Sequence, residues 1–277
     1  SAKAESNKNR KNTETVISVR EAWFRYEKDS KDILCGMNFD VHAGELTCIV
    51  GGNGAGKTTA LLTAAGVFSP YRGKVKYRGK PISTFRKDKG SAGKIGVLVQ
   101  NPLCCFVMDS VAEELEATAK AYKLPRSGIE EVIDIMQLQS VLGSNPYDIS
   151  GGELQRAAIA KLLLPEPEVI FLDEATKGMD AFFKAEFGAL LRRLAARGTA
   201  IVLVSHDIEF CAEFADRCAM FFNGTVIAEG TPQEVFLGNS FYTTSACRIS
   251  RGIIPDALTS EQIIDYANRC ERKKNDD

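Results

Sequence analysis

The sequence predicts an α/β fold built around a mainly parallel β-sheet. Short apolar runs typical of buried strands alternate along the chain with segments of helical periodicity. This alternation is typical of parallel sheets that are covered by helices on both faces. One strand leads directly into a glycine-rich loop and then a helix. The length of 277 residues, with 44% apolar and 26% charged residues, fits one large α/β domain with or without a small appendage.

The composition excludes several other classes of protein. With 35 basic and 36 acidic residues, no global field favours nucleic acid or an anionic membrane as partner. No apolar run reaches the roughly 18 residues that a membrane-spanning helix needs. The eight cysteines form no C-x-x-C pair, so we expect reduced and mostly buried thiols. Residues 1–15 are polar and predict a disordered arm or an expression remnant. The absent initiator Met suggests that the chain is part of something longer.

The first third of the chain predicts several strands before and after the glycine-rich loop. Strand patterns cover residues 16–25, 33–41, 46–50, 74–77 and 95–99, and a helix is predicted for residues 57–65. The run at 46–50 is continuously apolar, which is typical of a strand buried on both faces. We expect it to position the loop that follows.

The middle of the chain predicts a helical subdomain at about residues 103–164. Helical periodicity covers residues 111–122, 129–142 and 153–164, and no convincing strand separates them. Strands resume at 169–172, 200–205, 218–222 and 225–229, with an amphipathic helix at 182–197 and a hairpin turn at Asn223-Gly224. We therefore expect one domain over residues 16–238 and a tail over 239–277, with a short helix at 260–267.

The glycine-rich loop matches G-x-x-x-x-G-K-[ST], the pattern of a nucleotide-phosphate-binding loop. It consists of Gly51, Gly52, Asn53, Gly54, Ala55, Gly56, Lys57, Thr58 and Thr59. Its glycines let backbone N–H groups converge on phosphate oxygens, and the following helix adds its dipole. Lys57 is expected to contact the β- and γ-phosphates of ATP, and the Thr58 hydroxyl to bind Mg²⁺. The alternative is a merely flexible turn.

The apolar run at 169–172 ends in two carboxylates, Asp173 and Glu174. A parallel strand that ends this way places both acids at the sheet edge where ligands bind. Asp173 would hold Mg²⁺, and Glu174 would polarise the water that attacks the γ-phosphate. A strand that ends in two acids is often only a solvated strand end. Its combination with the phosphate loop favours catalysis of ATP hydrolysis.

A third motif, Ile149-Ser150-Gly151-Gly152-Glu153, begins a predicted helix, with Ser150 as its N-cap. It resembles the signature LSGGQ of ABC ATPases, with Ile149 and Glu153 in place of Leu and Gln. On this resemblance the fold is a P-loop NTPase of the ABC ATPase type, with an antiparallel β subdomain besides the helical one. The resemblance covers roughly residues 16–236.

The resemblance implies roles for further residues. Gln100 is similar to the glutamine that senses Mg²⁺ and the attacking water, and His206 to the switch histidine that contacts the γ-phosphate. Tyr26 is similar to the aromatic residue that stacks on adenine, although sheet packing would also explain it. Gly178-Met179-Asp180 matches the loop that carries Asp180 toward the partner subunit.

The resemblance also implies partners. In ABC ATPases, Ser150, Gly151 and Gly152 would contact ATP held by a second ATPase domain, which is an identical chain, a paralogue or a fused half. Residues 100–114 and 250–267 resemble the energy-coupling factor (ECF) transporter ATPases. These use an integral membrane subunit to import vitamins or transition-metal ions such as cobalt and nickel. We therefore expect a peripheral protein at the cytoplasmic face of the membrane, with no nucleic acid as partner.

Two alternatives stay open at this point. The chain could be a soluble ABC ATPase that acts in cluster assembly, translation or DNA repair. No charged linker between two ATPase domains and no long coiled coil is present, which favours transport. The apolar stretch of residues 103–108 is either a docking surface for a membrane subunit or inner packing of the helical subdomain.

Overall fold

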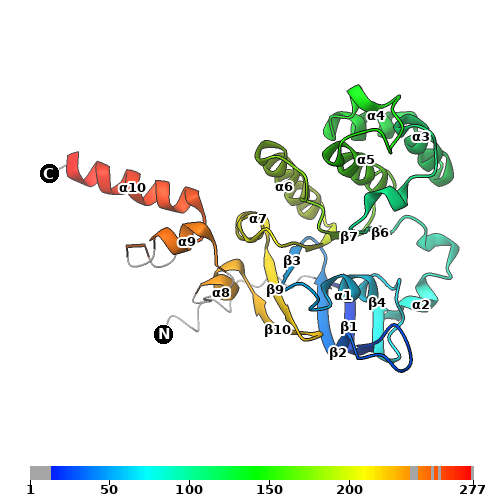
Figure 1. Ribbon diagram of the computed structural model, residues 1–277, viewed down its shortest axis with the longest axis horizontal. Helices are drawn as coiled ribbons and strands as arrows, with labels where there is room; N and C mark the ends of the chain where they lie inside the picture. Colours follow the sequence, from blue (N-terminus) through cyan, green and yellow to red (C-terminus); the bar gives the residue numbers. More distant parts are fainter. Residues whose placement is uncertain (1–13, 238–242, 251–252, 255–256, 276–277) are drawn as a thin grey trace.

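The structure, a computed structural model, describes residues 14–237, 243–250, 253–254 and 257–275, with the backbone alone for the last five (Figure 1). Its larger sheet has six strands in the order β10-β9-β3-β8-β7-β6. These are β3 (Leu46–Val50), β6 (Ile95–Leu98), β7 (Val169–Asp173), β8 (Ala200–Val204), β9 (Arg217–Phe222) and β10 (Thr225–Gly230). All neighbours are parallel except β9 and β10, which the Asn223-Gly224 turn joins as a hairpin. The predicted α/β fold is confirmed.

Both faces of the central strands of the six-stranded sheet are buried: successive side chains point to opposite sides, and those on either side lie in a hydrophobic cluster. On β3, Leu46, Cys48 and Val50 belong to one hydrophobic cluster and Ile49 to the other. Every residue of β3, β7 and β8 is buried. This explains why these strands are continuous apolar runs in the sequence rather than alternating ones.

A smaller antiparallel sheet packs against one face of the larger one across a helix. It has the order β2-β1-β4-β5, formed by β1 (Thr15–Phe24), β2 (Leu34–His42), β4 (Arg72–Tyr77) and β5 (Lys80–Pro81). Helix α1 (Lys57–Ala64) contacts strands of both sheets. Its buried residues Ala60, Leu61 and Ala64 share one hydrophobic cluster with them. This sheet is the antiparallel subdomain that the family resemblance implied.

The helical part lies together at one end of the molecule, beyond β6 and β7 (Figure 1). It consists of η2 (Pro102–Cys105), α3 (Val111–Tyr122), α4 (Arg126–Ile135), η3 (Gln139–Val141) and α5 (Gly151–Leu163). The single helix expected at 129–142 is wrong. Gln137 takes a left-handed conformation, with φ of 52°, and this ends α4 after Ile135. The short helix η3 follows.

Helices α6 (Ala181–Ala196) and α7 (Ile208–Phe214) cover the other face of the larger sheet. The sequence analysis missed several short elements, α2 (Ile82–Phe85), η1 (Lys89–Ser91), α7, α8 (Pro232–Phe236) and α9 (Ser245–Ser250). Helix α10 (Ser260–Asn275) is longer than expected and extends away from the sheets (Figure 1). No helix in the described part of the chain is long and apolar enough to cross a membrane.

The N-terminal arm predicted for residues 1–15 lies outside the described residues, except for its last two. Of these, Thr15 begins β1 and pairs with His42 of β2.

The parallel strands bring several predicted site residues to one edge of the sheet. Because β3, β6, β7 and β8 run in the same direction, the loops that follow them all start at their carboxyl ends. The register pairs Val204 of β8 with both Ile49 of β3 and Asp173 of β7. The glycine-rich loop, the two acids, Gln100 and His206 therefore start from neighbouring strand ends.

Candidate active site

The glycine-rich loop connects β3 to α1, and Lys57 is the first residue of that helix. Its Nζ folds back over the loop and donates to the carbonyl oxygens of Gly51, at 3.0 Å, and Gly52, at 2.9 Å. Burial lowers the pKa of Lys57, although the carboxylates of Glu174 and Asp173 favour its charged form. A lysine that is held in this way presents a positive charge at an anion site formed by a helix N-terminus.

Two glycines of the loop are required by close backbone approaches. A Cβ on Gly51 would lie 2.3 Å from the carbonyl oxygen of Phe221. Gly56 has φ of 98°, a conformation that favours glycine, and a Cβ there would lie 3.0 Å from the carbonyl oxygen of Ile33. The N–H of Gly224 also donates to the carbonyl oxygen of Ala55 at 3.2 Å. The β9–β10 hairpin thus supports the loop, a role for its Asn-Gly turn that the sequence analysis did not assign.

Thr58 and Asp173 form the arrangement that suits Mg²⁺ beside a triphosphate. The hydroxyl of Thr58 donates to Oδ2 of Asp173 at 2.8 Å. Asp173 is 1% exposed, and its Oδ1 has no hydrogen-bond partner among the described residues. Burial raises the pKa of Asp173, and the hydrogen bond from Thr58 opposes this shift. A buried carboxylate with a free oxygen next to a hydroxyl fits an Mg²⁺ site that is completed by water and phosphate oxygens.

The described residues contain no cluster of three or more His, Cys, Asp or Glu side chains that could hold a metal by themselves. Mg²⁺ commonly uses one or two carboxylates and takes its other ligands from phosphates and water, and the pair of Thr58 and Asp173 fits that pattern.

Glu174 lies between two predicted site residues. Its Oε2 accepts from Nε2 of Gln100 at 3.4 Å, and its Oε1 lies 3.1 Å from Nε2 of His206. Glu174 has φ of 53°, and its N–H donates to the carbonyl oxygen of Val204, which ties the residue to the end of β8. The Glu174 carboxylate therefore has other partners than the Asp173 carboxylate, which accepts from Thr58. The structure therefore brings Glu174, Gln100 and His206 together above the sheet edge.

Tyr26 lies beside the phosphate loop. Its hydroxyl is within 3.0 Å of Oγ1 of Thr59, and its side chain is 60% exposed. Phe24 and Phe68 contact it edge-on, with ring centroids 5.2 and 5.7 Å from that of Tyr26. An exposed ring held at its edge by two other rings suits stacking on a base. The sequence analysis missed the supporting role of Phe68.

The signature residues do not reach this site within the same chain. Ser150 is the N-cap of α5 and forms a capping box with Glu153. Gly152 lies against Gly178, whose carbonyl oxygen would be 3.0 Å from a Cβ on Gly152. Asp180 caps α6 by accepting from the N–H of Phe183 at 2.8 Å. Among the described residues, no hydrogen bond or ion pair links Ser150–Gly152 to the phosphate loop.

Fold and site together define a class of protein: a P-loop nucleotide-binding protein with a phosphate loop, an acidic strand end and a glutamate held by Gln100 and His206. The family model described as ABC transporter matches residues 34–177. This chain belongs to that family of ABC transporter ATP-binding proteins.

Curated relatives of this chain carry the names of ABC transporter ATP-binding proteins. A putative ABC transporter ATP-binding protein of Bacillus cereus is 38% identical over 92% of this chain and 46% of its own length. The energy-coupling factor transporter ATP-binding protein EcfA of Methanocaldococcus jannaschii is 33% identical over 80% of this chain and 81% of its own length. The chain spans about half the length of the Bacillus relatives that it matches.

Solved structures share the fold. The structure of cbiO1 from Clostridium perfringens, described as part of the ABC transporter complex cbiONQ, is 30% identical, with a TM-score of 0.70. The match covers 80% of this chain and 90% of that one. A dimeric ATP-binding cassette in a post-hydrolysis state with bound ADP and Pi is 25% identical, with a TM-score of 0.68 over 78% of this chain and 98% of that one.

Proposed function

We propose that this chain is the ATP-hydrolysing motor subunit of an ABC membrane transporter of the ECF type. The contact of Glu174 with both Gln100 and His206, beside the Thr58–Asp173 pair and Lys57, is the observation that carries the proposal. Together these residues supply a base, an anion site and a divalent cation site at one sheet edge. The similarity to EcfA and cbiO1 supports the ECF type.

In the proposed reaction, the phosphate loop binds the β- and γ-phosphates, and Lys57 leaves its carbonyl partners to neutralise them. Thr58 and Asp173 would hold Mg²⁺, which would neutralise negative charge on the β- and γ-phosphates of the bound ATP. Glu174 orients the attacking water in line with the γ-phosphate and accepts its proton. The water oxygen bonds to the γ-phosphorus while the bond from that phosphorus to the bridging oxygen breaks, which leaves ADP and inorganic phosphate. Gln100 and His206 position the Glu174 carboxylate, and Tyr26 stacks on the adenine.

The second face of the site is proposed to come from another ATPase domain. Ser150, Gly151 and Gly152 are exposed or half-buried and lie away from the phosphate loop of their own chain. The glycine N–H groups at the start of α5 are suited to a phosphate oxygen. A head-to-tail pair would place them on the partner's ATP. Hydrolysis then removes the bridging γ-phosphate and reopens the pair.

A membrane subunit is proposed to dock on a groove beside the helical part. A cavity of about 390 Å³ runs along β6 and is lined by α3, α5 and the η2 residues Cys104 and Cys105. In the adjoining stretch of residues 103–108, Phe106 is buried in the hydrophobic core, which supports inner packing. Val107 is 80% and Met108 41% exposed, which supports the proposed docking surface. The cargo would be a vitamin or a transition-metal ion, imported from the other side of the membrane.

The first test is Glu174→Gln, which keeps the shape of the side chain but removes the base. We expect ATP hydrolysis to fall at least about 100-fold, while ATP binding is retained and an ATP-bound dimer accumulates. Phosphate release and light scattering with and without ATP measure the two effects. Hydrolysis by this variant near the wild-type rate would contradict the catalytic role that we propose for Glu174.

The second test separates a transporter from a soluble ABC ATPase. The chain is tagged in its native cell, and complexes are purified from detergent-solubilised membranes and from the soluble fraction. Recovery with a small integral membrane protein supports the transporter. A membrane-independent complex with cluster-assembly, ribosomal or DNA-repair proteins contradicts it, even if Glu174→Gln abolishes hydrolysis.

A further inference from the structure

Basic residues are concentrated in one segment of this nearly neutral chain. Residues 72–94 contain nine basic residues and one acidic residue, so this segment of 23 residues carries a charge of +8. The rest of the chain, with 26 basic and 35 acidic residues, carries −9. The overall charge of −1 therefore conceals a strong separation of charge, which is typical of a protein with a polyanionic partner.

The fold places this basic segment at the edge of the antiparallel sheet. It comprises β4, β5, α2 and η1 and ends where β6 begins. All nine basic side chains are exposed: Arg72, Lys74, Lys76, Arg78, Lys80, Arg86, Lys87, Lys89 and Lys94. On β4, Val75 and Tyr77 point into the core, so the alternating Lys74 and Lys76 point outward.

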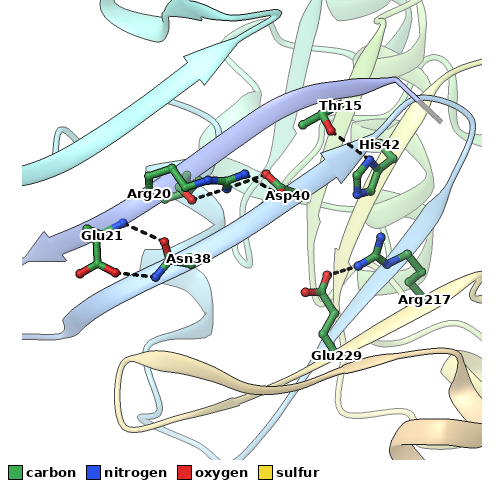
Figure 2. Close-up of polar contacts among 9 residues, drawn as sticks. Thr15, Arg20, Glu21, Asn38, Asp40, His42, Arg217 and Glu229 are labelled. Atoms are coloured by element: carbon green, nitrogen blue, oxygen red, sulfur yellow. Dashed lines mark hydrogen bonds and ion pairs between the residues drawn. The ribbon is translucent and has the colours of Figure 1, made fainter. Parts of the chain in front are cut away.

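The basic segment is poorly neutralised by its neighbours. On the adjoining strands, the charged and polar side chains pair with each other, as Arg20 does with both carboxylate oxygens of Asp40 at 2.7 and 2.8 Å (Figure 2). Arg78 and Lys94 bind Glu168. In the described part of the chain, by contrast, no hydrogen bond or ion pair neutralises five of the lysines: Lys74, Lys76, Lys80, Lys87 and Lys89.

The basic segment also borders the groove that we propose as the docking site of the membrane subunit. Gly93, near its end, lines the same cavity as Cys104 and Cys105. The ring of Tyr122 on α3 packs so closely on Gly93 that a Cβ there would lie 3.0 Å from it. A membrane subunit seated in this groove would bring the bilayer surface toward the exposed lysines.

We infer that the basic segment binds the anionic headgroups of the membrane surface next to the docked membrane subunit. Unpaired lysines are mobile point charges, and clusters of four to eight basic residues suit a diffuse anionic lipid surface. Single-stranded nucleic acid, by contrast, is commonly bound by basic grooves with exposed rings on which bases stack. Here the rings of Tyr77 and Phe85 stack on each other, with centroids 4.0 Å apart, and Tyr77 is buried.

This inference rests on the proposed transport function for its orientation toward the bilayer, but its test does not use ATP. The purified chain is sedimented with vesicles of phosphatidylcholine alone and with vesicles that contain about one third phosphatidylglycerol. We expect binding to the anionic vesicles only, and its loss at about 0.5 M salt, where surface charges are screened. Equal binding to both kinds of vesicle, or to neither, overturns the inference.

Charge variants locate the surface. Lys74→Gln with Lys76→Gln removes two outward charges from β4 and should weaken binding to anionic vesicles about 30-fold, whereas arginine at both positions should preserve it. The matched control, Lys28→Gln with Lys31→Gln, removes two exposed lysines from a turn that also carries Glu27, Asp29 and Asp32. An equal loss in the control pair, or no loss in the β4 pair, contradicts the assignment.

Two further measurements separate the alternatives. A short single-stranded RNA is added as competitor, and displacement of the chain from vesicles at equal phosphate concentration would assign the surface to nucleic acid instead. ATP hydrolysis is measured in parallel, and the β4 pair should keep it. Glu174→Gln should conversely keep vesicle binding, so that failure of the lipid surface and failure of the proposed ATPase are read separately.

Discussion

At the scale of single residues, Glu153 caps the start of α5 and also places a negative charge beside the signature residues Ser150–Gly152. Its Oε2 accepts from the backbone N–H of Ser150 at 2.9 Å and from the hydroxyl of Ser150 at 2.6 Å. These hydrogen bonds lower the pKa of Glu153, so its carboxylate is charged at neutral pH. We propose that the Ser150 hydroxyl contacts a partner's γ-phosphate, but here it donates to the Glu153 carboxylate, which is negative like the phosphate. ATP has to displace that contact.

Glu153→Gln should therefore strengthen the ATP-bound dimer. Glutamine at this position still completes a capping box, so α5 should stay folded. Removal of one negative charge next to the phosphate should lower the ATP concentration for half-maximal dimerisation by about fivefold. Light scattering in the Glu174→Gln background measures this concentration without interference from hydrolysis. An unchanged or higher concentration would contradict a contact between this helix end and the partner's ATP.

At the scale of elements, one buried carboxylate joins the stretch after Gln100 to the signature helix. Glu114 of α3 is 2% exposed and accepts from the N–H groups of Val107 and Met108, both at 2.9 Å. Lys161 of α5 pairs with it and also donates to the carbonyl oxygen of Cys105. These contacts link the proposed docking stretch to α5, the helix that begins at the signature residues.

Glu114→Gln should destabilise this junction. It leaves the ammonium of Lys161 half-buried without its carboxylate, and loss of one partner of a buried ion pair costs about 3 kcal/mol. Urea unfolding at neutral pH measures this loss. Lys161→Met in the same background removes the orphaned charge and should recover part of the stability. Unfolding midpoints equal to the wild type would show that the pair contributes nothing.

The same pair predicts a dependence of stability on pH. Burial disfavours the charged form of Glu114, but hydrogen bonds from Lys161 and from the backbone outweigh it and lower its pKa below the ordinary value of 4.5. Its stabilising contribution is therefore complete above about pH 4.5 and is lost as the pH falls through the lowered pKa. The difference in unfolding free energy between wild type and Glu114→Gln should shrink below pH 4.5. A difference that grows on acidification would contradict this sign.

At the scale of the whole molecule, the two motifs that we propose to contact ATP are separate within one chain. Among the described residues, no hydrogen bond or ion pair links Ser150–Gly152 to the phosphate loop. We propose that a second ATPase domain completes the site. The proposed function therefore depends on how two chains meet.

Complementation between two defective chains tests this composite site. One chain carries Glu174→Gln with an intact signature, and the other carries Ser150→Ala with an intact catalytic carboxylate. In a head-to-tail pair, one of the two sites receives both intact halves. Mixing equal amounts should restore about a quarter of the wild-type hydrolysis, because half of the pairs are mixed and each has one competent site. Activity equal to the mean of the separate chains would contradict a shared site.

The sequence determined the fold class and the local chemistry, because both depend on patterns of neighbouring residues. The apolar runs at β3, β7 and β8 and the loop that ends in Lys57-Thr58 are local signals, and the strand ends predict which side chains gather at one edge. Elements of four to seven residues, such as α2 and α7, were missed because one or two turns are too short for an apolar stripe to repeat. The break in the helix after Ile135 depends on the left-handed conformation of Gln137, which no apolar pattern records.

The tertiary structure alone decided the contacts between distant segments. The sequence shows Gln100, Glu174 and His206 as separate strand ends, and only the sheet order brings Gln100 and His206 to 3.4 and 3.1 Å from the Glu174 carboxylate. It shows charges that balance over 277 residues, and only the fold reveals that the lysines of β4 face outward without partners. Local patterns depend on residues that are neighbours in the sequence. Strand pairing, burial and charge neutralisation depend instead on which distant segments pack together.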